Sequence, residues 1–207
     1  CNPGNRPGST RFNPKECEEW AQPQRTLLGQ EQEGWLKRQF EKTQAQWNVL
    51  GQQTLLGRRN FDLDGGVRLW NDGWDGYAPA RDRVVRALQK HRVANPVLLG
   101  GDVHENWVGQ VMADYRRPEG PAVGVEFCGT SITSRSAGGA MAAKRVADHP
   151  HFLFAEGTRR GYGVCEFTPG AMRTTLRVLD DVTRPDARVE TLASFAVQAG
   201  RPVVERG

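Results

Sequence analysis

One pair of side chains in this 207-residue sequence has the types and spacing expected of metal ligands. The apolar run 97–99 leads directly into Gly100-Gly101-Asp102-Val103-His104. A buried strand that ends in this way presents a carboxylate and an imidazole at the carboxyl edge of a sheet, where α/β sheets usually bind ligands. In extended chain, positions two apart point to the same side, and this donor pair suits iron, manganese or zinc. The alternative is structural: Asp102 caps a turn and His104 forms a local hydrogen bond.

A second group of candidates lies in the run 71–77 and shortly after it. This run, with Arg81, brings together acidic groups, two large aromatic rings and a guanidinium. A guanidinium binds phosphate through two parallel hydrogen bonds, and the rings of Trp74 and Tyr77 can wall a substrate cleft. We therefore predict that Trp74, Tyr77 and Arg81 bind substrate. The alternative is a rigid loop in which Asp75 pairs with Arg81 and Trp74 fills the core.

Two further stretches have less specific patterns. Residues 127–134 are rich in hydroxyl groups after a predicted strand, and they either line an anion site or form an ordinary turn. His149 and His151 flank Pro150, where the end of a helix followed by the start of a strand explains the pattern. We assign neither histidine to the site. The sequence has no Gly-x-Ser-x-Gly nucleophile motif.

The elements that position these residues follow from hydrophobic periodicity. Trp35, Leu36 and Phe40 within 30–42 have helical spacing, which predicts one amphipathic helix. A second is predicted after Pro79, with Val84, Val85 and Leu88 on one face, and 138–148 is predicted as a helix of small residues. Strands are predicted from alternating or wholly apolar runs at 47–54, 97–99, 108–113, 123–127, 163–167, 173–179 and 194–197. Residues 1–23 are predicted to be irregular, and 24–207 to form one α/β unit, a mixed sheet sandwich with helices outside.

Composition and charge limit the class of protein. The net charge of +4 is scattered, and hydrophobic residues make up 38% of the chain, which favours a soluble globular domain without a nucleic-acid patch. The longest apolar stretch, 95–101, is far shorter than the roughly 20 residues that span a bilayer. No charged leader precedes an apolar signal core. We therefore expect a soluble chain with no transmembrane segment.

The four cysteines, Cys1, Cys17, Cys128 and Cys165, lack any Cys-x-x-Cys spacing, which argues against a structural zinc site. Cys1 and Cys17 bracket a stretch rich in Pro, Gly and Asn. A disulfide between them, which would stabilise such a loop by about 3 kcal/mol and imply an oxidising compartment, is one interpretation. Reduced, partly buried thiols are the other.

Taken in order, these motifs resemble the alkaline phosphatase D (PhoD) family of metallophosphoesterases, also described as phosphodiesterases. The resemblance covers nearly the whole chain, and the ordered set is specific although each motif alone is weak. The matching motifs are Phe12-Asn13-Pro14 with Cys17, Arg25-Thr26-Leu27-Leu28-Gly29 with Gln32 and Trp35-Leu36, Ala45-Gln46-Trp47-Asn48-Val49-Leu50, Asp72-Gly73-Trp74-Asp75-Gly76-Tyr77 with Arg81, the run 95–104, Glu126-Phe127 with Gly129-Thr130-Ser131-Ile132, and Arg160-Gly161-Tyr162-Gly163.

The resemblance implies a calcineurin-like core of two mixed sheets flanked by helices, and a metal-dependent phosphatase or phosphodiesterase acting on phosphate mono- or diesters. It implies iron and calcium as cofactors, Asp102 and His104 as the last metal-binding motif, and a secreted or periplasmic bacterial enzyme. The family's earlier metal motifs have no counterpart before Phe12, so we expect the C-terminal half of the family domain, completed by a chain that carries the N-terminal half. The isolated chain is then expected to hydrolyse little p-nitrophenyl phosphate. The alternative is a non-catalytic fragment or subunit of the same fold that binds a partner.

Overall fold

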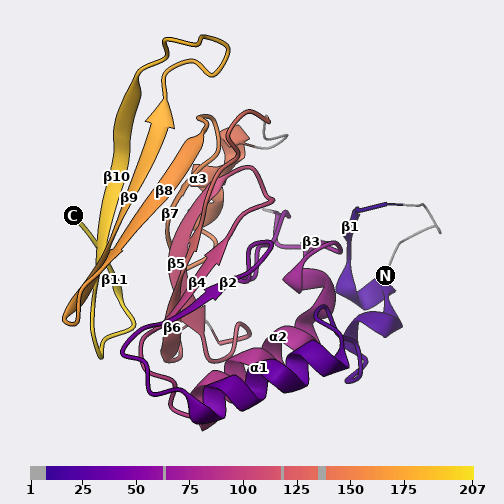
Figure 1. Ribbon diagram of the computed structural model, residues 1–207. Coiled ribbons are helices and arrows are strands. Elements are labelled where there is room, and N and C mark those ends of the chain that lie inside the picture. The colour runs from indigo at the N-terminus through magenta and orange to yellow at the C-terminus, as the bar shows by residue number, and fades with distance from the viewer. Residues whose placement is uncertain (1–7, 63, 118, 135–138) are drawn as a thin grey trace.

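The computed structural model describes residues 8–62, 64–117, 119–134 and 139–207 (Figure 1). Its three α-helices are α1 (Gln30–Lys42), α2 (Ala78–Lys90) and the short α3 (Ala142–Val146). Two 3-10 helices, Pro14–Glu16 and Glu18–Ala21, lie in the N-terminal segment, and two more, Trp74–Tyr77 and Gly139–Met141, directly precede α2 and α3. Among the described residues, no helix is both long and apolar enough to cross a bilayer.

A five-stranded mixed sheet forms the centre of the molecule, in the order β2-β4-β6-β5-β7. Its strands are β2 (Asn48–Gly51), β4 (Pro96–Gly100), β6 (Ala122–Cys128), β5 (Asn106–Met112) and β7 (Phe152–Glu156). Strands β2, β4 and β6 run parallel, whereas β5 is antiparallel to both β6 and β7. The predicted apolar strand at 97–99 is therefore central, and Val97 and Leu98 are fully buried.

A four-stranded antiparallel sheet packs on one face of the mixed sheet, in the order β11-β10-β9-β8. Its strands are β8 (Gly161–Phe167), β9 (Ala171–Leu179), β10 (Val189–Gln198) and β11 (Val204–Arg206). Alternate side chains of β9 and β10 point inward and meet side chains of β4, β5 and β6 in one apolar cluster. A separate two-stranded pairing joins β1 (Arg11–Phe12) to β3 (Leu69–Trp70).

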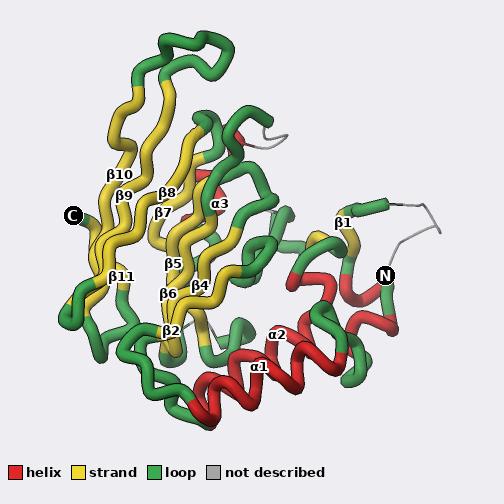
Figure 2. Tube along the Cα trace, in the orientation of Figure 1, coloured by secondary structure: helices red, strands yellow, loops and turns green. Residues whose placement is uncertain are grey.

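Helices α1 and α2 cover the opposite face of the mixed sheet, so the molecule has three layers (Figure 2). Val84, Val85 and Leu88 of α2 are buried against Leu98 of β4 and neighbouring strands, as the helical spacing predicts. Trp35 of α1 differs from the prediction, because it is 52% exposed although it shares the helical spacing of the buried Phe40. Trp35 is thus the most exposed of three large rings on the surface of the described part of the chain, the others being Tyr162 and Phe167.

The predicted α/β sandwich is confirmed, with differences of detail. The second sheet is wholly antiparallel where a mixed sheet was predicted, because its strands are joined by short turns. The predicted helix 138–148 shortens to a 3-10 turn at Gly139–Met141 followed by α3, and its first predicted residue lies outside the described ones. Of the predicted irregular segment 1–23, residues 1–7 are likewise outside, and the rest holds β1 and two 3-10 helices.

The cysteines separate into two kinds. Cys17 is disulfide-bonded, and its predicted partner Cys1 lies outside the described residues. Cys128 and Cys165 are free thiols, and burial raises the pKa of each. The interpretation that all four thiols are reduced therefore does not hold for Cys17.

Candidate metal-binding turn and its surroundings

The Asp102–His104 turn follows β4 at the carboxyl edge of the mixed sheet. The N–H of Gly101 donates to the carbonyl of Gln53 (3.2 Å), and the N–H of Gly129 donates to that of Gly100 (2.9 Å). The ends of β2, β4 and β6 therefore meet around the turn. This is the position predicted for a ligand site in a sheet whose neighbouring strands are parallel.

The backbone of the turn is not extended, which corrects the geometry expected from the sequence. Asp102 and His104 both have left-handed backbone conformations, with φ of 67° and 58°. The two-residue spacing therefore does not by itself direct both side chains to one side. Asp and His are among the few non-glycine residues that adopt this conformation readily, and it persists only where the surroundings fix it. The Asp102 side chain is exposed, and His104 is half-buried.

Two side chains fix the backbone of His104. Its carbonyl accepts hydrogen bonds from Thr130 Oγ1 (3.1 Å) and from Arg160 Nη1 (3.0 Å). Arg160 is buried and also donates to Ser131 Oγ (2.8 Å). The hydroxyl-rich run 127–134 therefore anchors the Asp102–His104 turn, which favours a structural role over the anion site considered from the sequence.

Glu105, which the sequence reasoning did not single out, fixes the other side of the turn. Its buried Oε2 accepts from Arg59 Nη1 (2.7 Å) and from Trp107 Nε1 (2.9 Å), and Arg145 Nη1 lies 3.9 Å from Oε1. Burial lowers the pKa of Arg59, and the adjacent carboxylate of Glu105 opposes that effect. The sequence shows an acidic residue directly after the histidine. It gives no sign that buried arginines from elsewhere in the chain pair with this residue.

The loop before α2 is packed rather than open. Trp74 is buried, and its Nε1 donates to Gln52 Oε1 (2.9 Å). The buried Arg81 donates from Nη1 to Asp75 Oδ1 (2.6 Å) and to the carbonyl of Leu56 (3.0 Å). These contacts are those of the rigid-loop alternative.

The rest of this loop is tied to the N-terminal segment. The guanidinium of Arg25 stacks over the half-buried Tyr77 ring at 4.5 Å, and its Nε donates to the carbonyl of Gly76 (2.8 Å). Trp20 Nε1 donates to the carbonyl of Asp75 (2.7 Å). The direct role in substrate binding predicted for Trp74, Tyr77 and Arg81 stays a prediction.

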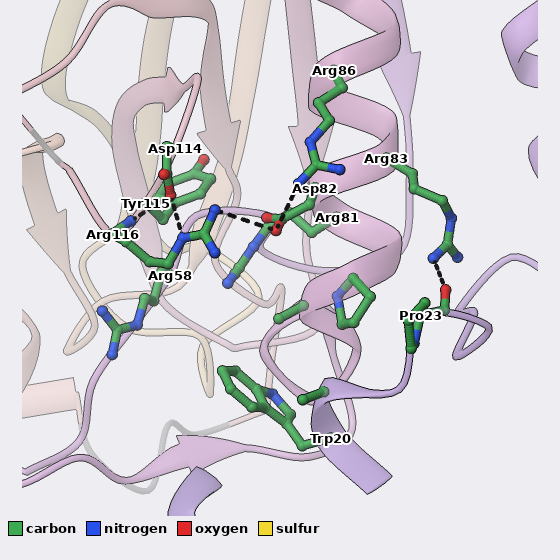
Figure 3. Close-up of a pocket in the computed structure, with 13 residues that line it drawn as sticks. Trp20, Pro23, Arg58, Arg81, Asp82, Arg83, Arg86, Asp114, Tyr115 and Arg116 are labelled. Atoms are coloured by element: carbon green, nitrogen blue, oxygen red, sulfur yellow. Dashed lines mark hydrogen bonds and ion pairs between the residues drawn. The ribbon is translucent and has the colours of Figure 1, made fainter. Parts of the chain in front are cut away.

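A pocket of about 430 Å³ lies between the start of α2 and residues 114–116 (Figure 3). Five arginines are among its lining residues, and several of them form ion pairs. A carboxylate oxygen of Asp82 lies 3.7 Å from Arg86 and 4.0 Å from Arg116. Arg116 also pairs with Asp114 at 2.8 Å. Of the candidate site residues, this lining includes only Arg81. The pocket is therefore distinct from the Asp102–His104 turn.

The two histidines left unassigned are structural. His149 accepts from the N–H of Asn60 at Nε2 (2.7 Å) and donates from Nδ1 to the carbonyl of Arg145 (2.5 Å). His151 donates from Nε2 to the carbonyl of Arg58 (2.9 Å). Burial lowers the pKa of both, that of His151 to about 3. Both rings are therefore neutral members of the core at ordinary pH.

A buried carboxylate in the centre of the mixed sheet ties down the loop after β2. Glu126 of β6 accepts from the N–H groups of Leu56 (2.5 Å) and Gly57 (2.8 Å). Burial raises its pKa to about 7, although these two hydrogen bonds favour the charged form. The sequence pattern placed Glu126 in a strand but gave no sign of this contact with a distant loop.

The donor types of the turn fit a metal ion, but the pair is incomplete. A carboxylate and an imidazole suit iron or zinc, and calcium takes carboxylate oxygens. Within the described ranges, no group of three or more His, Cys, Asp or Glu side chains is placed to hold an ion. Asp102 and His104 therefore supply part of a metal site at most.

Comparison with known proteins defines the class. The structure matches one described as "Structure of PhoD" with a TM-score of 0.85 and 34% identity, covering 96% of this chain and 38% of that one. The chain therefore has the fold of the corresponding part of that structure. Residues 5–176 match the family model "PhoD-like phosphatase", and the chain belongs to that family.

A curated relative gives the same answer. Alkaline phosphatase D of Bacillus subtilis (strain 168) is 38% identical over 203 residues, which cover 95% of this chain and 33% of the relative. The chain corresponds to the C-terminal part of that protein. It thus spans a third or slightly more of the length of the relatives that it matches.

Proposed function

We propose that this chain is the C-terminal part of a metal-dependent phosphate ester hydrolase and that Asp102 and His104 are two of its metal ligands. The observation that carries the proposal is the turn itself. In a chain of the PhoD-like phosphatase family, a carboxylate and an imidazole follow the central strand β4 on a left-handed backbone held from both sides. Such a strained, clamped turn at the carboxyl edge of a sheet is typical of a functional site.

Iron and calcium are the proposed cofactors. A bound ion would polarise a phosphoryl oxygen and lower the pKa of a water molecule, the two effects that metals contribute to phosphate ester hydrolysis. The residues of this chain would orient the donors: Thr130 and Arg160 hold the carbonyl of His104, and Arg59 holds the carboxylate of the next residue. The substrate would be a phosphate mono- or diester.

Trp74, Tyr77 and Arg81 are proposed to shape the substrate side of the site. The link from Trp74 to Gln52 and the pairing of Arg81 with Asp75 support an indirect contribution, through the loops beside the turn, more than direct contact. Secretion or a periplasmic location is proposed as well, and the disulfide at Cys17 supports an oxidising compartment.

A second candidate is a non-catalytic subunit that keeps the fold and binds a partner. The observation that favours it is the incomplete donor set, because the described residues bring no third metal-binding side chain to the turn. The remaining ligands of an active centre would have to come from polypeptide outside the matched third of the relatives. We therefore expect little hydrolysis of p-nitrophenyl phosphate by this chain alone with iron and calcium, and robust turnover would show that it needs no complement.

Metal binding distinguishes the two candidates. Fe²⁺ and Ca²⁺ binding would be measured by titration calorimetry and metal analysis for the chain co-expressed with the remaining part of alkaline phosphatase D. Asp102→Asn and His104→Asn are suitable variants, because Asn tolerates the left-handed backbone. Asp186→Ala and His91→Ala, at positions distant along the chain, are matched controls.

The phosphatase proposal predicts that each turn variant loses metal and hydrolysis of p-nitrophenyl phosphate or its bis ester together, while the controls keep both. Equal metal content and activity in all four variants would overturn the assignment of Asp102 and His104. A stable complex without metal or turnover would favour the non-catalytic subunit.

A further inference from the structure

Three arginines gather around one aromatic ring. Their guanidinium carbons lie 4.3, 4.5 and 4.9 Å from the centre of the Phe61 ring, and they belong to Arg11, Arg59 and Arg145 respectively. The fold brings these three side chains, here called the arginine cluster, from β1, from the loop after β2 and from α3. Because a ring has two faces, at least two of the three cations share one face. None of the three was a candidate in the sequence.

The arginine cluster has more positive than negative charge. Glu105 pairs with Arg59 at 2.7 Å and lies 3.9 Å from Arg145. Among the described residues, no other carboxylate is within ion-pair distance of the three guanidinium groups. Three cations and one carboxylate leave two positive charges in excess. Burial lowers the pKa of Arg145; Glu105 opposes this effect, and the charges of the other two arginines add to it.

Buried donors of the arginine cluster also lack acceptors. Arg145 is 5% exposed, and its Nε and Nη1 have no hydrogen-bond partner within the described ranges, since 3.9 Å to Glu105 is too long for a hydrogen bond. Asp75, whose charge also acts on Arg59, is already bound to Arg81 at 2.6 Å. Contact with a ring offsets only part of the cost of burying a cation. The cluster therefore has the charge and the donors of an anion-binding site.

The arginine cluster reaches the surface beside the Asp102–His104 turn. Arg11 is exposed and Phe61 is half-buried, whereas Arg59 and Arg145 are buried. An anion can therefore approach from the side of Arg11. Glu105, which both buried arginines face, directly follows His104 in the chain. The cluster and the turn are thus joined through one residue.

We propose that Arg11, Arg59 and Arg145 bind a terminal phosphate group. Guanidinium groups donate pairs of parallel hydrogen bonds to phosphate oxygens. A terminal phosphate carries about −1.5 to −2 charges at pH 7, which matches the excess charge of the cluster. A phosphodiester carries a single charge, so the site favours phosphate monoesters over diesters. This preference among substrates rests on the proposed function, whereas the binding of phosphate rests on the cluster alone.

Phosphate binding by the metal-free chain tests the site. Titration calorimetry would compare inorganic phosphate, phenylphosphonate and dimethyl phosphate at constant ionic strength, with chloride as the background anion. Arg11→Gln removes the exposed charge of the cluster, and Arg145→Gln removes a buried one. Arg206→Gln is the matched control, because Arg206 is an exposed arginine that stacks on the Phe154 ring at 5.6 Å, outside the cluster.

We expect the Kd of inorganic phosphate and of phenylphosphonate to rise about tenfold or more in Arg11→Gln and Arg145→Gln, and to change less than about twofold in Arg206→Gln. Dimethyl phosphate, with one charge, should bind about tenfold more weakly than phenylphosphonate. In NMR spectra, the Nε–H signal of Arg145 should shift on addition of phosphate in the wild type and in Arg206→Gln.

Equal phosphate binding by the wild type and both cluster variants would overturn the proposal, as would phosphate binding no tighter than that of chloride. If Arg145→Gln does not fold, the exposed Arg11→Gln decides. Binding of inorganic phosphate without phenylphosphonate would overturn the role in substrate binding, and equal binding of phenylphosphonate and dimethyl phosphate would overturn the preference for monoesters. The measurement involves neither metal nor turnover, so its failure is distinguishable from that of the proposed function, which is tested by metal content and hydrolysis in the turn variants.

Discussion

Neutralising Glu105 is expected to destabilise the fold and loosen the Asp102–His104 turn. In Glu105→Gln the shape and the acceptor for Trp107 are retained, but the buried Arg59 loses its carboxylate at 2.7 Å. Removing one partner of a buried ion pair costs about 3–5 kcal/mol, because the other charge stays buried and unpaired. We expect a loss near the lower figure, about 3 kcal/mol in the free energy of unfolding, since Gln keeps part of the hydrogen bonding.

The loss is measured by urea unfolding of a thermodynamic cycle, which consists of wild type, Glu105→Gln, Arg59→Met and the double variant. The coupling free energy of the cycle should be about 2 kcal/mol or more. Glu190→Gln is the matched control, because Arg159 and Glu190 form an ion pair of 2.8 Å on the surface, and its loss should cost less than about 1 kcal/mol. Equal losses in Glu105→Gln and Glu190→Gln, or a coupling near zero, would refute the reasoning.

Three further predictions concern buried positions of the mixed sheet and its surroundings. Because burial raises the pKa of Glu126 to about 7, the folded state favours its protonated form, and the stability from this group is present below pH 4.5 and lost as pH rises through 7. Urea unfolding at pH 4.5 and 8 should therefore show the stability difference between wild type and Glu126→Gln changing by about 3 kcal/mol, and a constant difference would contradict this. His151, whose pKa is lowered to about 3, acts in the opposite direction, because its contribution to stability is present above pH 6.5 and lost as pH falls. Between pH 6.5 and 4, His151→Gln should therefore lose about 3 kcal/mol less free energy of unfolding than wild type. Gly100→Ala would bring a Cβ atom within 2.3 Å of the carbonyl oxygen of Thr54, and thermal unfolding should show a cost of about 2 kcal/mol, whereas Gly51→Ala, with open space around it, should be nearly neutral.

Local periodicity predicted the elements well where one face is apolar. The helix predicted at 30–42 coincides with α1, and the apolar run 97–99 is the buried centre of β4. These patterns report burial directly, because apolar spacing reflects which face meets the core. The same spacing predicted a buried Trp35, but its ring is exposed and lines the groove between α1 and β2.

Only some features of the candidate site could be predicted from the sequence. Asp102 and His104 stand together in the sequence, so their proximity could be predicted, but their left-handed backbone could not. Contacts between distant segments were missed for the same reason: Glu105 meets Arg59 across 46 positions, and Glu126 meets Leu56 across 70. A single sequence contains no local pattern for a buried carboxylate whose partners come from another loop.

The N-terminal segment helps to order the loop before α2. Trp20 and Arg25 hold the carbonyls of Asp75 and Gly76 from more than 50 positions away in sequence. Each of these bonds closes a long stretch of chain, so forming it has a conformational-entropy cost that both segments share. The loop that carries Trp74 and Tyr77 is therefore ordered together with the N-terminal segment, and the two should unfold as one unit.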